Sequence, residues 1–392
     1  MLRARKAVLA LVVVSAVAAA AVAGGSASSQ QANTVTIGWA YDGSGAMAPF
    51  DGPALATAKD HVKRVNRGPG VNLRITTCDT QGNKPATAKA CAARLLGQGA
   101  DVIFTTCDVD FAAPVVQESI NAGKLTIAPC IGTDQMGPKR FGAKGRLAFS
   151  YGNVAQDEGS AMAEYAWKRG WRTASLATDT VIVYFRNVVQ AFKARFTQLG
   201  GKIAAEETYQ SLGGNPASWQ STVTRLNGED ADVIVTVTAA AFGAQVPIIS
   251  GLRTLGNNTP ILNSWAGDGN YWYTPEPKVS NYYYVTYASA FGNDPVKAVN
   301  AMARLNKAAI AKAGSTGGFV TGPAAIDGIL VALKRTGGNT SGAALAAQME
   351  RFKNVPTLSG LVSFSPSLHS VFGRQYRVIR VTNNTPRVVG TI

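Results

Sequence analysis

Two acidic side chains stand where a chemical site could form. Asp108 and Asp110 follow an apolar run at 101–106 that is typical of a buried strand. Two carboxylates at a set separation across a glycosidic bond could serve as acid and base. The sequence offers no partner carboxylates for Asp108 and Asp110, which disfavours this use. We expect them either to face a ligand cleft or, for Asp110, to cap a helix that begins at Phe111.

An aromatic loop forms a second candidate site. It follows the strand expected at 260–263 and contains Trp265, Asp268, Tyr271, Trp272 and Tyr273. Such a loop is either a lid packed on its own rings or a wall for a planar or apolar ligand. A Gly-rich segment at 42–45 is likewise either a flexible turn or a loop whose amides meet a ligand.

Motifs of known catalysts are missing. The chain lacks G-x-S-x-G, H-E-x-x-H, G-x-x-x-x-G-K-[ST] and G-x-G-x-x-G. Its two histidines, His61 and His369, lie far apart in sequence, which disfavours a histidine metal site. We expect no metal, no cofactor and no enzymatic activity.

Four cysteines occur, all in the first half of the chain: Cys78, Cys91, Cys107 and Cys130. Since C-x-x-C is absent, structural disulfides are favoured over metal binding or redox catalysis. Four cysteines allow three pairings, and their spacing does not choose among them.

The N-terminus has the pattern of a secretory leader. Basic residues at 3, 5 and 6 precede an apolar run at 7–22, and small residues at 21–23 or 25–27 suit cleavage. We predict a signal peptide at 1–23, with an uncleaved anchor as the alternative. No cysteine lies near the cut, and no later stretch is expected to span a membrane. The mature protein is therefore expected to be secreted or periplasmic and not lipid-anchored.

The formal net charge is +15 over 392 residues, but the basic residues are scattered singly and are not interleaved with aromatics. This disfavours nucleic-acid binding. A general attraction to anionic surfaces is compatible with the charge.

Apolar periodicity predicts an α/β fold. Strands expected at 34–40, 71–77, 101–106 and 124–128 alternate with helices at 53–67, 85–96 and 111–122. The pattern restarts with helices at 156–169, 181–199, 217–227 and 242–255 and strands at 173–177, 202–208, 232–237 and 260–263. A strand at 282–287, helices at 295–313 and 321–334 and short antiparallel strands at 362–364, 375–381 and 387–389 follow.

Short connections of this kind predict parallel, doubly wound sheets with helices on both faces, and ligands at the carboxyl ends of the strands. We expect two such lobes with a cleft between them. The expected N-terminal lobe comprises 34–153 and 287–360, and the expected C-terminal lobe comprises 154–286 and 361–392.

The sequence resembles the type I periplasmic binding proteins, in particular the branched-chain-amino-acid-type receptors of ABC importers. The resemblance rests on TIGWAYDGSGAMAPFDGPALATA, CDTQGNKPATAKACAARLL, GADVIFTTCDVDFAAPVVQESINAGKLTIAP and FSYGNVAQDEGSAMAEYAWKRGWRTASLA, in that order. It implies two lobes joined by three crossovers, which close on a small-molecule solute and deliver it to an ABC importer permease. A ligand-binding sensor module that signals to a partner membrane protein is the alternative.

The resemblance also implies site residues. It pairs Cys78 with Cys107 and leaves Cys91 with Cys130. It places at the ligand Phe50, Asp108, Asp110, Ile131, Gly132, Thr133, Tyr184, Thr238, Ala239, Trp265 and Asp268.

Two departures from the family pattern bear on the solute. A tryptophan, Trp265, stands about where the family has its acidic residue. Asp108 and Asp110 stand where the family has a hydroxyl that helps hold the carboxylate of the ligand. A carboxylate beside a carboxylate is unfavourable unless one is protonated. We therefore expect a solute other than a simple zwitterion: a cation, a hydroxylated solute, or an aromatic or amide compound.

Overall fold

The computed structural model describes residues 34–130 and 132–392, so the expected leader at 1–23 and the expected site residue Ile131 lie outside the described residues. The strands of the first lobe form one parallel sheet in the order β13-β5-β4-β3-β1-β2. These strands are β1 (Thr34–Tyr41), β2 (Asn72–Asp79), β3 (Val102–Phe104), β4 (Leu125–Ala128), β5 (Ala148–Asn153) and β13 (Ser370–Val371).

The second lobe contains a sheet in the order β15-β14-β10-β9-β8-β6-β7. Its strands are β6 (Thr173–Asp179), β7 (Lys202–Tyr209), β8 (Val233–Val237), β9 (Ile261–Asn263), β10 (Tyr282–Thr286), β14 (Arg377–Thr382) and β15 (Thr385–Thr391). The last two pair antiparallel, as expected for the tail. Asn383 and Asn384 form their two-residue turn, both with positive φ, which asparagine tolerates in tight hairpins.

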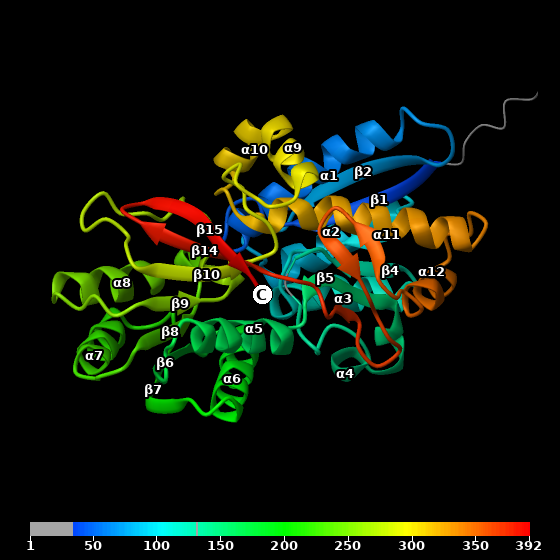
Figure 1. Ribbon diagram of the computed structural model, residues 1–392. Helices are drawn as coiled ribbons and strands as arrows, with labels where there is room; N and C mark the ends of the chain where they lie inside the picture. The colour runs from blue at the N-terminus through cyan, green and yellow to red at the C-terminus, as the bar shows by residue number, and fades with distance from the viewer. Residues whose placement is uncertain (1–33, 131) are drawn as a thin grey trace, which may run out of the picture. The chain divides into compact units, whose positions relative to one another are not determined.

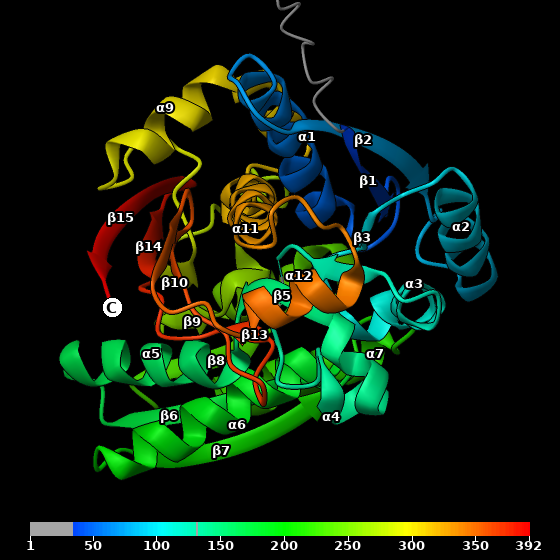
Figure 2. The ribbon, with the colours of Figure 1, turned by 90° about the vertical axis from the view of Figure 1, so that its right-hand side faces the viewer.

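Helices flank both sheets (Figures 1 and 2). Those of the first lobe are α1 (Ala48–Val65), α2 (Pro85–Gly97), α3 (Val109–Asn121), α4 (Pro138–Phe141), α9 (Lys297–Leu305), α10 (Lys307–Lys312), α11 (Thr321–Arg335) and α12 (Gly342–Met349). Those of the second are α5 (Ala155–Lys168), α6 (Val183–Gln198), α7 (Pro216–Asn227) and α8 (Gln245–Thr254). The described residues further contain a small hairpin of β11 (Val355–Thr357) and β12 (Gly360–Val362) and four 3₁₀ turns, η1 (Gly142–Leu147), η2 (Ala240–Phe242), η3 (Trp265–Gly267) and η4 (Gly317–Val320).

Burial explains the composition of the strands. Every residue of β3, β8 and β10 is buried, because helices cover both faces of the sheets. β7 and β15, which lie at sheet edges, instead alternate between exposed and less exposed residues. The expected α/β fold with two doubly wound lobes is thereby confirmed.

One helical stretch of the described chain, Gly317–Arg335, is long and apolar enough to cross a membrane, although we expected none. However, 78% of its most apolar window is buried inside the molecule. Its apolar composition is thus that of a core helix.

Three segments cross between the lobes: one after Asn153, one between β10 and α9, and one between β13 and β14. β13 pairs with β5, so 370–371 belong to the first sheet, whereas the expected division assigned 361–392 to the second lobe. We propose a division in which the third crossing follows Val371.

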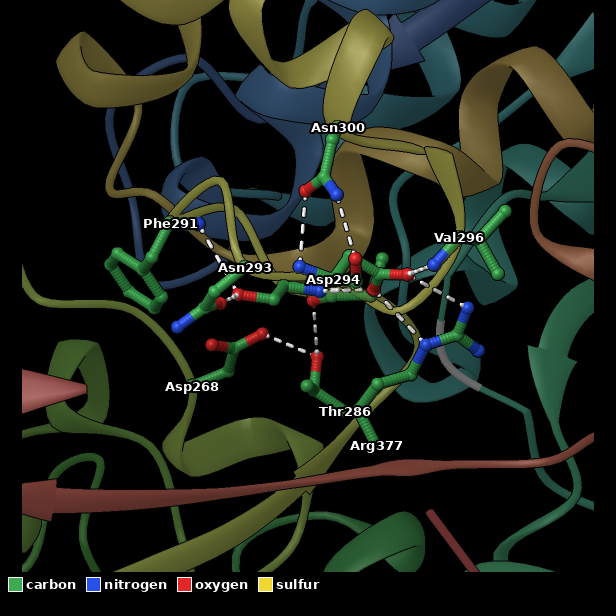
Figure 3. A network of polar contacts seen from close by, with 10 residues as sticks. Asp268, Thr286, Phe291, Asn293, Asp294, Val296, Asn300 and Arg377 are labelled. Atoms are coloured by element: carbon green, nitrogen blue, oxygen red, sulfur yellow. Dashed lines mark hydrogen bonds and ion pairs between the residues drawn. The ribbon is translucent and has the colours of Figure 1, made fainter. Parts of the chain in front are cut away.

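The second crossing is fixed by a buried ion pair. Arg377 on β14 donates to the Asp294 carboxylate at 3.0 and 3.1 Å, and the same carboxylate accepts the backbone N–H groups of Ser289 and Val296 (Figure 3). Asn300 bonds the backbone of Asp294 from the start of α9. The segment that joins β10 to α9 therefore has a defined path.

Candidate functional site

Aromatic rings from the two lobes meet between them. Phe50 of α1 is 1% exposed, and its ring centroid lies 4.9 Å from that of Trp265, which follows β9 in the other lobe. Trp265 in turn stacks on Tyr287 of the second crossing, at 4.9 Å and 28°. The structure thus brings together Phe50 and Trp265, two of the predicted site residues.

Asp108 is fully buried at the start of α3. Its Oδ1 accepts the backbone N–H groups of Asp110 (2.8 Å) and Phe111 (3.4 Å). The helix is therefore capped by Asp108, whereas Asp110 was the expected cap. Its Oδ2 has no hydrogen-bond partner among the described residues. Burial, together with the nearby charge of Asp110, raises the pKa of Asp108 to about 7.

Asp110 connects the lobes directly. Its Oδ2 accepts the backbone N–H of Val183, the first residue of α6, at 2.7 Å, and its Oδ1 pairs with Arg140. Both of its oxygens are therefore engaged within the protein.

The loop after β4 packs on its own lobe. A Cβ on Gly132 would lie 2.2 Å from the Asn153 carbonyl oxygen, so only glycine allows this approach of the two backbones. Thr133 is buried; its carbonyl accepts the Ser370 hydroxyl at 2.6 Å and its Oγ1 accepts the Gln135 N–H.

The cysteines pair differently from our expectation. The bonds are Cys78–Cys91 and Cys107–Cys130, with Cα–Cα distances of 5.5 and 4.7 Å, so the predicted Cys78–Cys107 and Cys91–Cys130 pairs are wrong. The sheet order explains this: β1 lies between β2, which carries Cys78, and β3, which precedes Cys107. β3 and β4 are neighbours, so the residues that follow their carboxyl ends can be joined.

Glu158 of α5 is the residue that sequence reasoning missed. It is fully buried, and its Oε1 accepts hydrogen bonds from the Tyr184 hydroxyl at 2.8 Å and from the backbone N–H of Trp265 at 2.6 Å. Its Oε2 has no partner in the described part of the chain. Burial raises the pKa of Glu158 to about 7. A carboxyl group therefore does stand beside Trp265, where the family resemblance places an acid, but α5 supplies it.

A sequence signal for Glu158 exists. Glu158, Met162 and Tyr165 are spaced i, i+4 and i+7, which puts all three on one face of α5, and all three are buried. A carboxylate on the apolar face of a helix is a candidate for function because its burial is costly.

Thr238 and Ala239 lie at the end of β8. The Thr238 hydroxyl donates to Asp179 Oδ2 at 2.7 Å within the same sheet, and Ala239 is 1% exposed. Just beyond them, the Phe242 ring meets the Phe111 ring of the other lobe edge-on at 6.0 Å.

Asp268 is fully engaged by the protein. Its carboxylate accepts Thr286 Oγ1–H, Gly317 N–H and Gly269 N–H, each at 2.6 Å, and Figure 3 shows the bond to Thr286. Gly317 lies in the first lobe, so Asp268 joins the lobes. Burial raises the pKa of Asp268 to about 6.

Few buried polar atoms of these residues lack a hydrogen-bond partner among the described residues, and these atoms could bond to a ligand. Asp110 of the first lobe and Glu158 of the second bond to neighbouring residues at the N-terminus of α6, Val183 and Tyr184. Asp108 lies two residues before Asp110 in the chain. Its Oδ2, Glu158 Oε2 and Trp265 Nε1 are buried atoms without a partner in the described part of the chain. They can accept from and donate to a polar solute. The described residues contain no group of three or more His, Cys, Asp or Glu side chains suited to a metal.

These features define a bilobed α/β protein with polar and aromatic side chains between its lobes. A family model described as periplasmic binding protein matches residues 34–386. The chain belongs to this family. No curated protein matches it in sequence.

Solved structures share the fold. The branched-chain amino acid transporter substrate-binding protein LivJ of Streptococcus pneumoniae, in complex with isoleucine, is 20% identical, with a TM-score of 0.74 over 91% of this chain and 99% of that one. The leucine-binding protein LivK of Thermotoga maritima is 17% identical, with a TM-score of 0.74 over 91% and 98%. A solute-binding protein of an ABC transporter from Rhodopseudomonas palustris, in complex with 3,4-dihydroxybenzoic acid, is 16% identical, with a TM-score of 0.73 over 92% and 97%.

Proposed function

We propose that this protein is an extracytoplasmic receptor that captures a small solute between its lobes and delivers it to an ABC importer. The observation that carries the proposal is a pair of buried carboxyl groups, Asp108 from the first lobe and Glu158 from the second, each with one unpartnered oxygen. A buried polar atom without a partner is costly. A solute that bonds to both removes this cost only when the lobes are together.

Closure follows from this arrangement. A solute that contacts both lobes binds the closed state more tightly than the open one and shifts the population toward it. The Asp110–Val183 and Asp268–Gly317 bonds, which cross between the lobes, stabilise the same closed state. The receptor changes the solute's surroundings and not its covalent structure, so we propose no catalytic role.

The chemistry of the site favours a solute rich in hydrogen-bond donors. In their ionised form, which prevails above about pH 7, both carboxyl groups repel an anionic group and accept from N–H or O–H groups. A cation, a polyol or an amide fits this requirement. Isoleucine and dihydroxybenzoic acid, which relatives bind, each carry a carboxylate that this site does not favour.

Isothermal titration after a thermal-shift screen tests this function. The screen compares amines, amides and polyols with leucine, valine and 4-hydroxybenzoate. We expect a donor-rich solute to bind, and Asp108→Asn and Glu158→Gln each to weaken its binding at least tenfold. Glu229→Gln, an exposed control, leaves affinity unchanged. Tight leucine or valine binding that survives Asp108→Asn would contradict the proposed solute class, and catalytic turnover of the solute would contradict the receptor role.

We further propose that the protein acts outside the cytoplasm, as expected for a periplasmic binding protein, and that it does so without a lipid anchor. Cell fractionation checks this: the protein should be released with the periplasmic or extracellular fraction, or by salt. A requirement for detergent would contradict it.

A further inference from the structure

Three neighbouring helices of the first lobe, α1, α9 and α10, carry a concentration of unpaired positive charge. They lie side by side (Figures 1 and 2), and α1 contacts the α9–α10 segment through Arg64–Met302 and Asp60–Asn306 contacts at 3.2 and 3.3 Å. Six exposed basic side chains on them have no ion pair or side-chain hydrogen bond among the residues described. We call this set the basic face: Lys59, Lys63, Lys297, Arg304, Lys307 and Lys312.

Acidic residues do not balance this face. The sequence has no Asp or Glu from 295 to 326. The acids nearby are already engaged: Asp60 pairs with Arg64, and Asp327 pairs with His61. In the second lobe some exposed basic residues pair with acids, as Lys193 does with Glu206, whereas others, such as Lys168, Lys202 and Lys278, have no ion pair among the described residues. What distinguishes the basic face is that its unpaired charges lie on three adjoining helices, two of which, α9 and α10, contain no acid.

An exposed leucine lies within the basic face. Leu305, at the end of α9 between Arg304 and Lys307, is 68% exposed, the largest value among the exposed large apolar side chains of the described chain. On α9 and α10, Ala298, Ala308 and Ala311 are also exposed, and neither helix contains an acid. An apolar side chain surrounded by cations suits an interface that is anionic at its surface and apolar beneath.

We infer that the basic face binds the surface of a lipid bilayer rich in anionic headgroups. The six charges are spread over three helices and do not converge on one pocket, so they fit an extended sheet of negative charge better than a single phosphate. Leu305 can enter the headgroup region while the lysines and arginine remain among the headgroups. Such binding holds the protein near a membrane without a lipid anchor.

Vesicle sedimentation tests this inference. The chain is used without residues 1–32, so that its apolar N-terminal run cannot bind lipid; the remainder forms one compact unit. We expect binding to phosphatidylcholine vesicles that contain phosphatidylglycerol, weak binding to phosphatidylcholine alone, and loss of binding as NaCl rises.

Variants separate the face from net charge. Lys297→Glu/Arg304→Glu/Lys307→Glu should lower the affinity for anionic vesicles by roughly a hundredfold or more, since each basic residue contributes about fivefold near an anionic surface. The control Lys168→Glu/Lys202→Glu/Lys278→Glu replaces three exposed lysines of the second lobe and changes the net charge by the same amount. It should have a much smaller effect on vesicle binding. Leu305→Ser should weaken binding several-fold.

Three results would overturn the inference: no binding of the unaltered protein to anionic vesicles, equal losses in the two triple variants, or binding to soluble polyglutamate in place of vesicles. The last would indicate an acidic protein partner. The affinity of Lys297→Glu/Arg304→Glu/Lys307→Glu for the solute should equal that of the unaltered protein. This result keeps the inference separate from the proposed receptor function.

Discussion

The guanidinium of Arg374 donates through Nε to Asn153 Oδ1 at 2.6 Å, which joins the third crossing between the lobes to the first. The same guanidinium lies 4.8 Å from the ring centroid of Tyr287, in the second crossing, and Nη2 donates to the Tyr151 carbonyl at 2.9 Å. One buried side chain thus contacts all three crossings. Burial lowers the pKa of Arg374 to about 10, and it remains charged at neutral pH.

Replacing Arg374 by alanine should therefore destabilise the fold strongly. The change leaves buried acceptors at Asn153 and Tyr151 without donors, at a cost of roughly 2–4 kcal/mol in the free energy of unfolding. Urea unfolding measures it. Arg380→Ala, an exposed arginine on β14 that lies over Tyr283, is the matched control and should cost less than about 1 kcal/mol. Equal effects of the two variants would disprove the special role of Arg374.

Disulfide mapping tests the pairing. Peptides from a digest of the unreduced protein should link Cys78 to Cys91 and Cys107 to Cys130. Replacing Cys107 and Cys130 by serine should lower the free energy of unfolding by roughly 3 kcal/mol, since their bond closes a loop of 23 residues. The Cys78–Cys91 bond, which spans 13 residues, should contribute slightly less. Recovery of a Cys78–Cys107 peptide would contradict the structure.

Stability should depend on pH through Glu158 and Asp108. Their pKa values of about 7 in the folded protein lie above the ordinary 4.5 and 3.8, so the folded state holds protons that the unfolded chain releases. Their contribution to the free energy of unfolding must fall as pH rises from about 4 to about 7 and then level off.

Glu158→Gln isolates the pH dependence that Glu158 causes, because the amide can still accept a hydrogen bond from the backbone N–H of Trp265 but cannot ionise. Calorimetry at pH 5 and pH 8 should show that the variant gains stability relative to the unaltered protein at the higher pH, by a few degrees in Tm. The exposed Glu229→Gln control should show no such change. A Glu158→Gln difference that is the same at both pH values would refute buried ionisation at this site.

The aromatic contact between the lobes should appear as energetic coupling. Phe50→Ala and Tyr184→Ala together should weaken solute binding more than either change alone, since they remove side chains from opposite lobes. In the solute-free protein, Phe50→Ala and Trp265→Ala should couple by about 0.5–1.5 kcal/mol in a double-mutant cycle. If only one lobe's residue affects binding, closure around the solute is not the mechanism.

The order of strands and helices could be predicted because buried apolar runs alternate with amphipathic segments. The strand β5 was not expected, since Ser150, Gly152 and Asn153 give it a polar composition. Its polar groups are buried because the crossings satisfy them, as when Asn153 bonds to Arg374. Helix α12 was missed because its residues are mainly alanine and glycine, which show no clear apolar stripe.

The candidate site could be predicted only in part. Phe50 and Trp265, from the two lobes, do lie together. Tyr184 bonds to Glu158, whose carboxylate also accepts the backbone N–H of Trp265. Asp268 was expected at the ligand, but its carboxylate is occupied by Gly317 N–H, which comes from a segment 49 residues away. Long-range partners of this kind, like the strand order that decides the cysteine pairing, are not encoded in local spacing.

Titration calorimetry of one donor-rich solute against the unaltered protein and Glu158→Gln tests whether the buried carboxyl groups hold the solute. We expect saturable binding of one solute per chain, stronger at pH 8 than at pH 5.5, and at least tenfold weaker in Glu158→Gln at pH 8. Binding that is equally strong in both proteins and independent of pH would show that the buried carboxyl groups between the lobes do not hold the solute.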